Sequence, residues 1–159
     1  RVPGLVGNGK QSDALVEFVD FYPTLADLCG IKAPDNLNGH SLRALMEQPE
    51  REWKPYAFHQ FWKDGQMGYT IRNRDFRYTA WLDDPNGRAY PPGSGEAYGP
   101  VEFEELYDLR NDPNETENVA GRKSFEALQR ELRADLFRMI EDPAAASRHF
   151  APNLESERN

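Results

Sequence analysis

The stretch YAFHQFWKDGQMGYTIRNRDFRYTAWL, residues 56–82, decides the fold. It holds three runs rich in aromatic and β-branched residues, which predict β-strands at Tyr56–Phe61, Met67–Arg72 and Phe76–Leu82. Turn residues at 63–66 separate the first two runs, and Asn73-Arg74-Asp75 suits a tight hairpin turn between the last two. Because such short connections join antiparallel neighbours, the stretch predicts an antiparallel sheet.

A fourth strand and a helix complete this part of the chain. Phe103–Leu109 repeats the strand pattern, and Lys123–Glu141 is the clearest helix in the sequence, with Pro143 ending it. The helix carries an apolar stripe formed by Phe125, Leu128, Leu132, Leu136, Met139 and Ile140. A helix with one apolar stripe packs on a sheet with one apolar face. We therefore predict an α+β fold, with a roughly four-stranded antiparallel sheet and a packed C-terminal helix.

The first part of the chain is predicted to contain helix and loop. Apolar residues recur at helical spacing over Leu15–Cys29, with Ser12 as the expected N-cap and Gly30 at the helix exit. Pro23 falls inside this pattern and predicts a kink or a break. Loop residues and one short helical turn follow at 31–46.

A polar, charged connection at 49–55 separates the two parts. We place the domain boundary there, between residues 1–48 and residues 49–159. Within the second part, residues 83–100 are rich in glycine, proline and acidic or amide residues and predict a long exposed loop. The last residues, 147–159, are expected to form a tail.

Composition limits the classes of function. The chain has 159 residues, 38% of them hydrophobic, and a net charge of −8, which argues against a nucleic-acid partner. No apolar run is long enough to span a membrane. The single cysteine, Cys29, can form no disulfide within the chain, and its apolar helical position predicts a small buried thiol. The opening Arg1-Val2-Pro3-Gly4 is not a signal peptide. Because the sequence opens with arginine and not with an initiator methionine, a fragment or a processed chain is expected.

Four acids cluster after the fourth strand: Asp108, Asp112, Glu115 and Glu117. Calcium needs several oxygens converging at about 2.3–2.6 Å. The neighbouring Asp112-Pro113 pair instead favours a turn that the acids cap. The glycine-rich stretch at 4–9 follows no clear strand and lacks the spacing of a phosphate loop. From the residues alone we assign neither a catalytic residue nor a metal ligand to this chain.

Three segments carry a resemblance to the sulfatases. The first is Val19-Asp20-Phe21-Tyr22-Pro23-Thr24-Leu25 with Leu28 and Gly30-Ile31; the second is Asn38-Gly39-His40-Ser41-Leu42 with Leu45; the third is Glu105-Leu106-Tyr107-Asp108-Leu109 with Asp112-Pro113, Glu115, Asn118 and Ala120. They resemble the family's C-terminal motifs in order and in spacing. Asn38 stands where the family usually has Asp. The resemblance identifies residues 1–48 with the end of the large sulfatase α/β domain and residues 49–159 with the small C-terminal subdomain.

A fourth segment narrows the resemblance. Met67-Gly68-Tyr69-Thr70-Ile71-Arg72, followed by Asp75-Phe76-Arg77-Tyr78-Thr79 and Trp81, is similar to the iduronate-2-sulfatase branch. In that branch, basic and polar residues before this strand help to recognise the sugar. The resemblance therefore implies Lys63 as the best candidate to contact a sugar carboxylate or sulfate, followed by His59 and Gln60. From the residues alone, an exposed turn lysine is the favoured interpretation of Lys63, and a half-buried strand residue is the favoured interpretation of His59. The basic residues Arg72, Arg74 and Arg77 favour a solvated hairpin with local ion pairs.

The resemblance implies a sulfuric ester hydrolase as the complete protein. The family's nucleophile is a formylglycine made from a C/S-x-P-x-R motif, and its Ca²⁺ ligands lie upstream of this region. Here Cys29 is followed by Gly30-Ile31-Lys32, so nucleophile and metal ligands are expected outside this chain, which alone is expected to be inactive. The partners that the resemblance implies are a sulfated carbohydrate that contains a uronic acid and the N-terminal part of the same protein. An exported location is implied by the family alone.

Two alternatives stay open from the sequence. Phosphodiesterases and phosphonate hydrolases share the superfamily, and the upstream nucleophile motif would distinguish them. A non-catalytic glycan-binding or scaffold module is the third interpretation, for which binding of sulfated sugars by the chain alone is the test.

Overall fold

The computed structural model describes residues 1–84 and 99–142. Most of the predicted loop at 83–100, the helix stop at Pro143 and the predicted tail at 147–159 lie outside the described residues. The chain divides into two compact units, Arg1–Pro55 and a second that begins at Tyr56. Each unit is described by itself.

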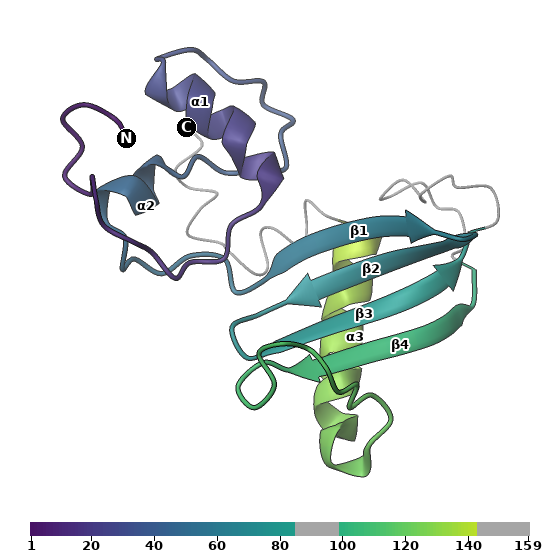
Figure 1. The fold of residues 1–159 in the computed structure, drawn as a ribbon. Helices are drawn as coiled ribbons and strands as arrows, with labels where there is room; N and C mark the ends of the chain where they lie inside the picture. The colour runs from purple at the N-terminus through teal and green to yellow at the C-terminus, as the bar shows by residue number, and fades with distance from the viewer. Residues whose placement is uncertain (85–98, 143–159) are drawn as a thin grey trace. The chain divides into compact units, whose positions relative to one another are not determined.

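The second unit has the predicted α+β architecture. Four strands, β1 (Ala57–Lys63), β2 (Gln66–Arg72), β3 (Phe76–Asp83) and β4 (Val101–Asp108), form one antiparallel sheet in the order β1-β2-β3-β4. A 3₁₀ turn, η2 (Lys123–Phe125), leads into the helix α3 (Glu126–Glu141). Figure 1 shows α3 running across one face of the sheet. The α+β prediction is confirmed.

Short turns set the register of this sheet. The β1–β2 hairpin closes with Asp64 and Gly65, whose φ angles are 51° and 85°. Two left-handed residues match the twist of an antiparallel hairpin, and glycine takes this conformation without strain. In the β2–β3 turn the Asn73 side-chain oxygen accepts the backbone N–H groups of Asp75 and Phe76 at 2.9 and 2.7 Å. Asn73 thus replaces a backbone turn with its own side chain.

The core of this unit lies between the sheet and α3. Leu132, Leu136 and Ile140 of the helix are at most 1% exposed. They belong to one cluster with side chains of β2, β3 and β4: Tyr69, Ile71, Tyr78, Ala80, Leu82 and Leu106. Polar contacts add to this packing, since the Tyr56 hydroxyl donates to Asp135 of α3 at 2.8 Å. Burial and the carboxylate beside it raise the pKa of Tyr56 above its ordinary value.

The first unit is built from short helices. It contains η1 (Phe18–Asp20), α1 (Phe21–Leu28) and α2 (Arg43–Glu47). The prediction of one helix beginning after Ser12 is wrong: Ser12 instead donates its hydroxyl to the Pro49 carbonyl oxygen at 2.6 Å. The prediction of a kink or a break at Pro23 is also wrong, since α1 is one helix that continues through this residue. Pro23 is the third residue of α1, where the backbone N–H has no partner within the helix, so a proline is tolerated.

The predicted exit of α1 at Gly30 is confirmed. Gly30 has a φ of 66° and donates its N–H to Asp27, while Ile31 donates to Ala26 at 2.8 Å. This pair of bonds is the Schellman ending of a helix. The prediction of a buried thiol at Cys29 is wrong. Cys29 is exposed, because it caps the C-terminal end of a short helix whose outer apolar residues are uncovered. No helix within the described residues is long and apolar enough to cross a bilayer.

Candidate functional site

The sheet face opposite α3 is the candidate site, and we call it the open face. Because Tyr69 and Ile71 point into the core, the alternate residues of β2 point away from α3. The pairing register extends this assignment across the sheet in four rows: Lys63–Gln66–Asp83; Phe61–Gly68–Trp81–Phe103; His59–Thr70–Thr79–Glu105; and Ala57–Arg72–Arg77–Tyr107. The open face is thus defined by these fifteen positions, and it mixes aromatic, basic and hydroxyl side chains.

The second of these rows, which we call the aromatic row, has an uneven surface. Phe61 and Phe103 at its ends are 55% and 53% exposed. Between them the six-membered ring of Trp81 lies over Gly68, since a Cβ added to Gly68 would come within 2.9–3.0 Å of that ring. Gly68 therefore provides the space in which Trp81 lies against the sheet. The row exposes aromatic rings on a face where an ordinary solvated sheet would carry polar side chains.

The third row contains a buried polar pair. The hydroxyls of Thr70 and Thr79 are 2.8 Å apart and share one hydrogen bond. Their residues are 7% and 3% exposed. A buried hydroxyl needs such a partner, so the pair satisfies itself and offers little to a ligand.

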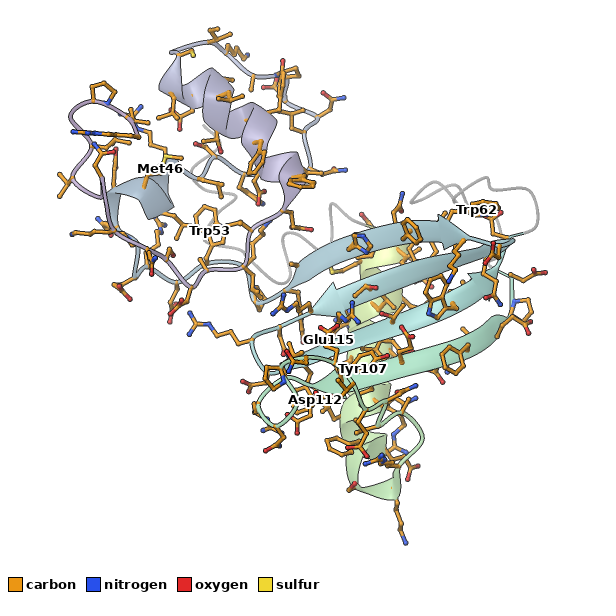
Figure 2. All side chains as sticks on the ribbon, viewed as in Figure 1. Met46, Trp53, Trp62, Tyr107, Asp112 and Glu115 are labelled. Atoms are coloured by element: carbon orange, nitrogen blue, oxygen red, sulfur yellow. The ribbon has the colours of Figure 1, made fainter. Side chains whose placement is uncertain are left out.

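The fourth row is covered at its β4 end by the loop that follows that strand. Arg77 forms a 2.5 Å ion pair with Glu115 and lies 5.1 Å from the centre of the Tyr107 ring. Figure 2 shows Glu115 and Tyr107 near one another. Glu115 has a φ of 56°, an unusual conformation for a residue with a side chain. Burial raises the pKa of Tyr107. This end of the open face is therefore occupied by contacts within the protein.

The four clustered acids are used in contacts within the protein, as the turn interpretation predicts. Asp108 accepts two hydrogen bonds from the Arg110 guanidinium, each at 2.9 Å, which lower its pKa to about 2. Asp112 accepts the backbone N–H groups of Thr116 and Glu117. The other two acids form ion pairs, Glu115 with Arg77 and Glu117 with Arg122. Within residues 1–84 and 99–142 no group of acids, histidines or cysteine could hold a metal ion.

The predicted substrate-binding residues all lie on the edge strand β1 and are all exposed. Lys63 and His59 belong to the open face and flank Phe61. Gln60 pairs with Tyr69, so it points to the other side of the sheet. In the part of the chain that the structure describes, Lys63 and Arg72 form no ion pair. The structure thus brings Lys63 and His59 to one surface and separates Gln60 from them.

The first unit contains a charged cluster that sequence analysis missed. Asp20, which is fully buried, accepts from the Lys54 ammonium at 2.8 and 3.1 Å and from the backbone N–H groups of His40 and Glu17, both at 2.9 Å. Lys54 also pairs with Glu17. Gly39 allows the close approach this requires, because a Cβ there would lie 2.0 Å from the Val19 carbonyl oxygen. The signal in the sequence is one acid inside an otherwise apolar helical run.

This cluster explains two of the sequence motifs without catalysis. Thr24 donates its hydroxyl to the Asp20 carbonyl oxygen and accepts the backbone N–H of Leu42 at 2.8 Å. Ser41 donates to Asp27 at 2.6 Å. The segments around Asp20 and around His40 therefore hold one another in place. Their residue types are those that a buried carboxylate and its donors need.

The comparisons with known proteins agree with this structure. The family described as "N-sulphoglucosamine sulphohydrolase, C-terminal" matches residues 1–88. The chain belongs to this family of sulfatase C-terminal regions. An N-acetylglucosamine-6-O-sulfatase of Bacteroides thetaiotaomicron is 26% identical over 140 residues, covering 83% of this chain and 22% of that protein. A Δ4,5-hexuronate-2-O-sulfatase of the same organism is 29% identical over 139 residues, covering 83% of this chain and 25% of that protein.

A solved structure shares the fold. It is of a protein in complex with its substrate D-glucosamine-2-N,6-O-disulfate, and it matches with a TM-score of 0.59 and 24% identity over 76% of this chain and 23% of that one. The chain spans about a quarter of the length of these sulfatases. The coarse assignment to a sulfatase C-terminal region is therefore confirmed.

Proposed function

We propose that this chain is the C-terminal part of a sulfatase that hydrolyses sulfate esters of a carbohydrate. The family match over residues 1–88, in a chain whose relatives are sulfatases, carries this proposal. The nucleophile and the metal ligands belong to polypeptide outside these residues. In support, the sequence contains no C/S-x-P-x-R motif, and the clustered acids already bind protein groups.

The two parts of the chain have different roles in this proposal. Residues 1–48 form the edge of the large α/β domain, and residues 49–159 form the small subdomain. The exposure of α1 supports the first role, since Phe21, Tyr22 and Leu25 are 50–62% exposed. A helix with apolar residues on its outer side is typical of one that packs against a further layer.

We further propose that Lys63 contacts the substrate, together with His59 on the same face of β1 and Gln60 on its other face. The ammonium of Lys63 is exposed and unpaired among the described residues, so it is available to an anionic group. The preferred substrate carries a uronic acid, as in the iduronate-2-sulfatase branch. The hexuronate-2-O-sulfatase among the relatives supports this choice. Lys63 then pairs with the sugar carboxylate or with a second sulfate.

The experiment is sulfate release by the complete protein that contains this chain. Sulfate esters of glucosamine and of hexuronates are compared with phosphodiesters and phosphonates of similar size. Turnover of sulfate esters only is expected, and turnover of phosphodiesters or phosphonates only would assign the other chemistry of the superfamily. No turnover of either class, with retained binding of sulfated sugars, would favour a glycan-binding module.

Variants test the role of Lys63. Lys63→Ala is expected to raise KM for a hexuronate sulfate about tenfold, because an ion pair to a bound anion contributes on the order of 1.5 kcal/mol. Lys32→Ala, which removes a lysine with an 86% exposed side chain, is the matched control and should leave KM unchanged. Equal KM values for the two variants would contradict the assignment of Lys63.

A further inference from the structure

The β1–β2 half of the open face combines exposed aromatic surface with unpaired positive charge. Phe61 is 55% exposed, and the Trp81 ring lies over Gly68, the residue that pairs with Phe61. Lys63 lies in the row on one side of Phe61, and His59 lies in the row on the other. Arg72 lies one row beyond His59. Two exposed cations therefore bracket the aromatic surface along the strands.

The charge on this half differs from the charge on the other half of the open face. The chain as a whole carries a net charge of −8, yet among the described residues Lys63 and Arg72 have no acidic partner. The other half of the face differs: Arg77 is paired with Glu115, and Phe103 lies in the row next to Glu105. An anion approaching the open face is therefore favoured at β1 and β2 and not at β4.

The dimensions exceed one sugar ring. Lys63 and His59 are four residues apart on one strand, or about 13 Å at the usual rise per residue. Arg72 lies one row further, at about 20 Å from Lys63 by the same rise. A single monosaccharide cannot contact Lys63 and Arg72 together, whereas an extended chain of linked sugars can.

We propose that this half of the open face binds an anionic oligosaccharide chain along β1. The surface is formed by Phe61, Lys63 and Arg72 together with the Trp81 ring, which reaches from β3 over Gly68 of β2. The sugar rings stack on Phe61 and on the Trp81 ring, and the carboxylates or sulfates of the chain pair with Lys63 and Arg72. This inference rests on the proposed function for its ligand class. It goes further in assigning a surface for the sugars beyond the one that is hydrolysed.

The test uses a ligand that a sulfatase does not turn over. A tetrasaccharide of alternating glucuronic acid and N-acetylglucosamine carries carboxylates and no sulfate ester. Its binding to the complete protein is measured by calorimetry, with a tetramer of N-acetylglucosamine as the neutral probe. Phe61→Ala is expected to weaken binding of both probes about two- to tenfold, since stacking on a ring contributes roughly 0.5–1.5 kcal/mol. Phe103→Ala, at a similarly exposed position of the same row but on β4, should leave both affinities unchanged.

Charge variants separate stacking from ion pairing. Arg72→Gln is expected to weaken only the acidic tetrasaccharide and to reduce the salt dependence of its binding. Arg74→Gln is the matched control, because Arg74 is exposed in the adjacent turn and is unpaired among the described residues. Equal effects of Arg72→Gln and Arg74→Gln, or of Phe61→Ala and Phe103→Ala, would overturn the proposal.

Other occupants of the face give different results. If the rest of the polypeptide covers it, Phe61→Ala will lower the unfolding temperature of the complete protein and leave both affinities unchanged, which overturns the proposal. Failure of the proposed function is visible separately, as absence of sulfate release. In that case Phe61-dependent binding of the unsulfated tetrasaccharide still supports the oligosaccharide surface.

Discussion

Different interactions stabilise the interior of each of the two units. The unit that begins at Tyr56 buries a continuous apolar core between its sheet and α3. The unit Arg1–Pro55 has few buried apolar residues and is organised around the buried Asp20 and its partners. Its α1 leaves Phe21, Tyr22 and Leu25 exposed. Since burial of apolar surface is the main stabilising term in folding, we expect the second unit to fold alone and the first to need contacts with further polypeptide.

The largest expected change in the free energy of unfolding concerns the unit Arg1–Pro55. Lys54→Met leaves Asp20 as a buried charge without its cation, and removal of one partner of a buried ion pair costs about 3–5 kcal/mol. The free energy of unfolding of the complete protein measures this loss. Lys32→Met, which removes an exposed lysine paired with Asp35, should change it by less than about 0.5 kcal/mol. Equal losses for the two variants would show that the Asp20 cluster does not hold the unit together.

Substitution of one leucine in each unit, Leu136 and Leu25, tests the difference in apolar burial between the two units. Leu136→Ala removes a fully buried side chain of α3 and should destabilise the second unit by about 2–5 kcal/mol in the 159-residue chain. Leu25→Ala, at a position 62% exposed, should cost less than about 0.5 kcal/mol there. In the complete protein Leu25→Ala should cost as much as Leu136→Ala, because α1 is then covered. Denaturant unfolding of the 159-residue chain and of the complete protein measures these losses. A small effect of Leu25→Ala in both proteins would contradict the proposal that α1 packs against a further layer.

The stability of the second unit at low pH depends on the contacts of Asp108 at the start of the loop after β4. The folded pKa of Asp108 is about 2, below its ordinary 3.8, because Arg110 and Asn111 donate to its carboxylate. Its contribution to stability is therefore fully present above about pH 4 and is lost as the pH falls through about 2. Asp108→Asn should destabilise the second unit by about 1.5–3 kcal/mol at pH 7 and flatten its pH dependence between 4 and 2. The control is Asp13→Asn, at an exposed position, which should follow the unaltered chain; the same acid profile for Asp108→Asn would contradict the pKa assignment.

The smallest effect concerns the threonine pair on the open face. Thr70→Val leaves the Thr79 hydroxyl buried without its partner and should cost about 1 kcal/mol. Replacing both threonines by valine removes the unsatisfied group and should cost less than the single change. A double-mutant cycle of unfolding free energies measures the coupling. Additive losses would mean that the two hydroxyls do not depend on one another.

The difference between the apolar core of the second unit and the Asp20 cluster of the first also explains which sequence predictions were confirmed. The sheet and α3 were predictable because side-chain alternation and an apolar stripe are local patterns that also describe the core. The start of the first helix was not, since Asp20 is bound by Lys54, 34 residues away, and no local pattern contains that contact. Ser12 has the residue type of an N-cap, yet its hydroxyl binds the carbonyl oxygen of Pro49.

The candidate site was predictable in part. His59 and Lys63 are four positions apart on one strand, so side-chain alternation places them on the same face. Gln60 is an odd number of positions from both, so it lies on the opposite face. The Trp81 ring over Gly68 was not predictable, because it depends on the register of β2 against β3. A one-residue shift of that register would place other residues opposite one another.

The most direct test of the central claim is sulfate release by the complete protein and by the 159-residue chain, measured side by side on glucosamine and hexuronate sulfates. We predict release by the complete protein and none by the chain alone, since the nucleophile and metal ligands are proposed to lie outside it. Release by the chain alone, or its absence from the complete protein on every sulfate ester, would contradict this account.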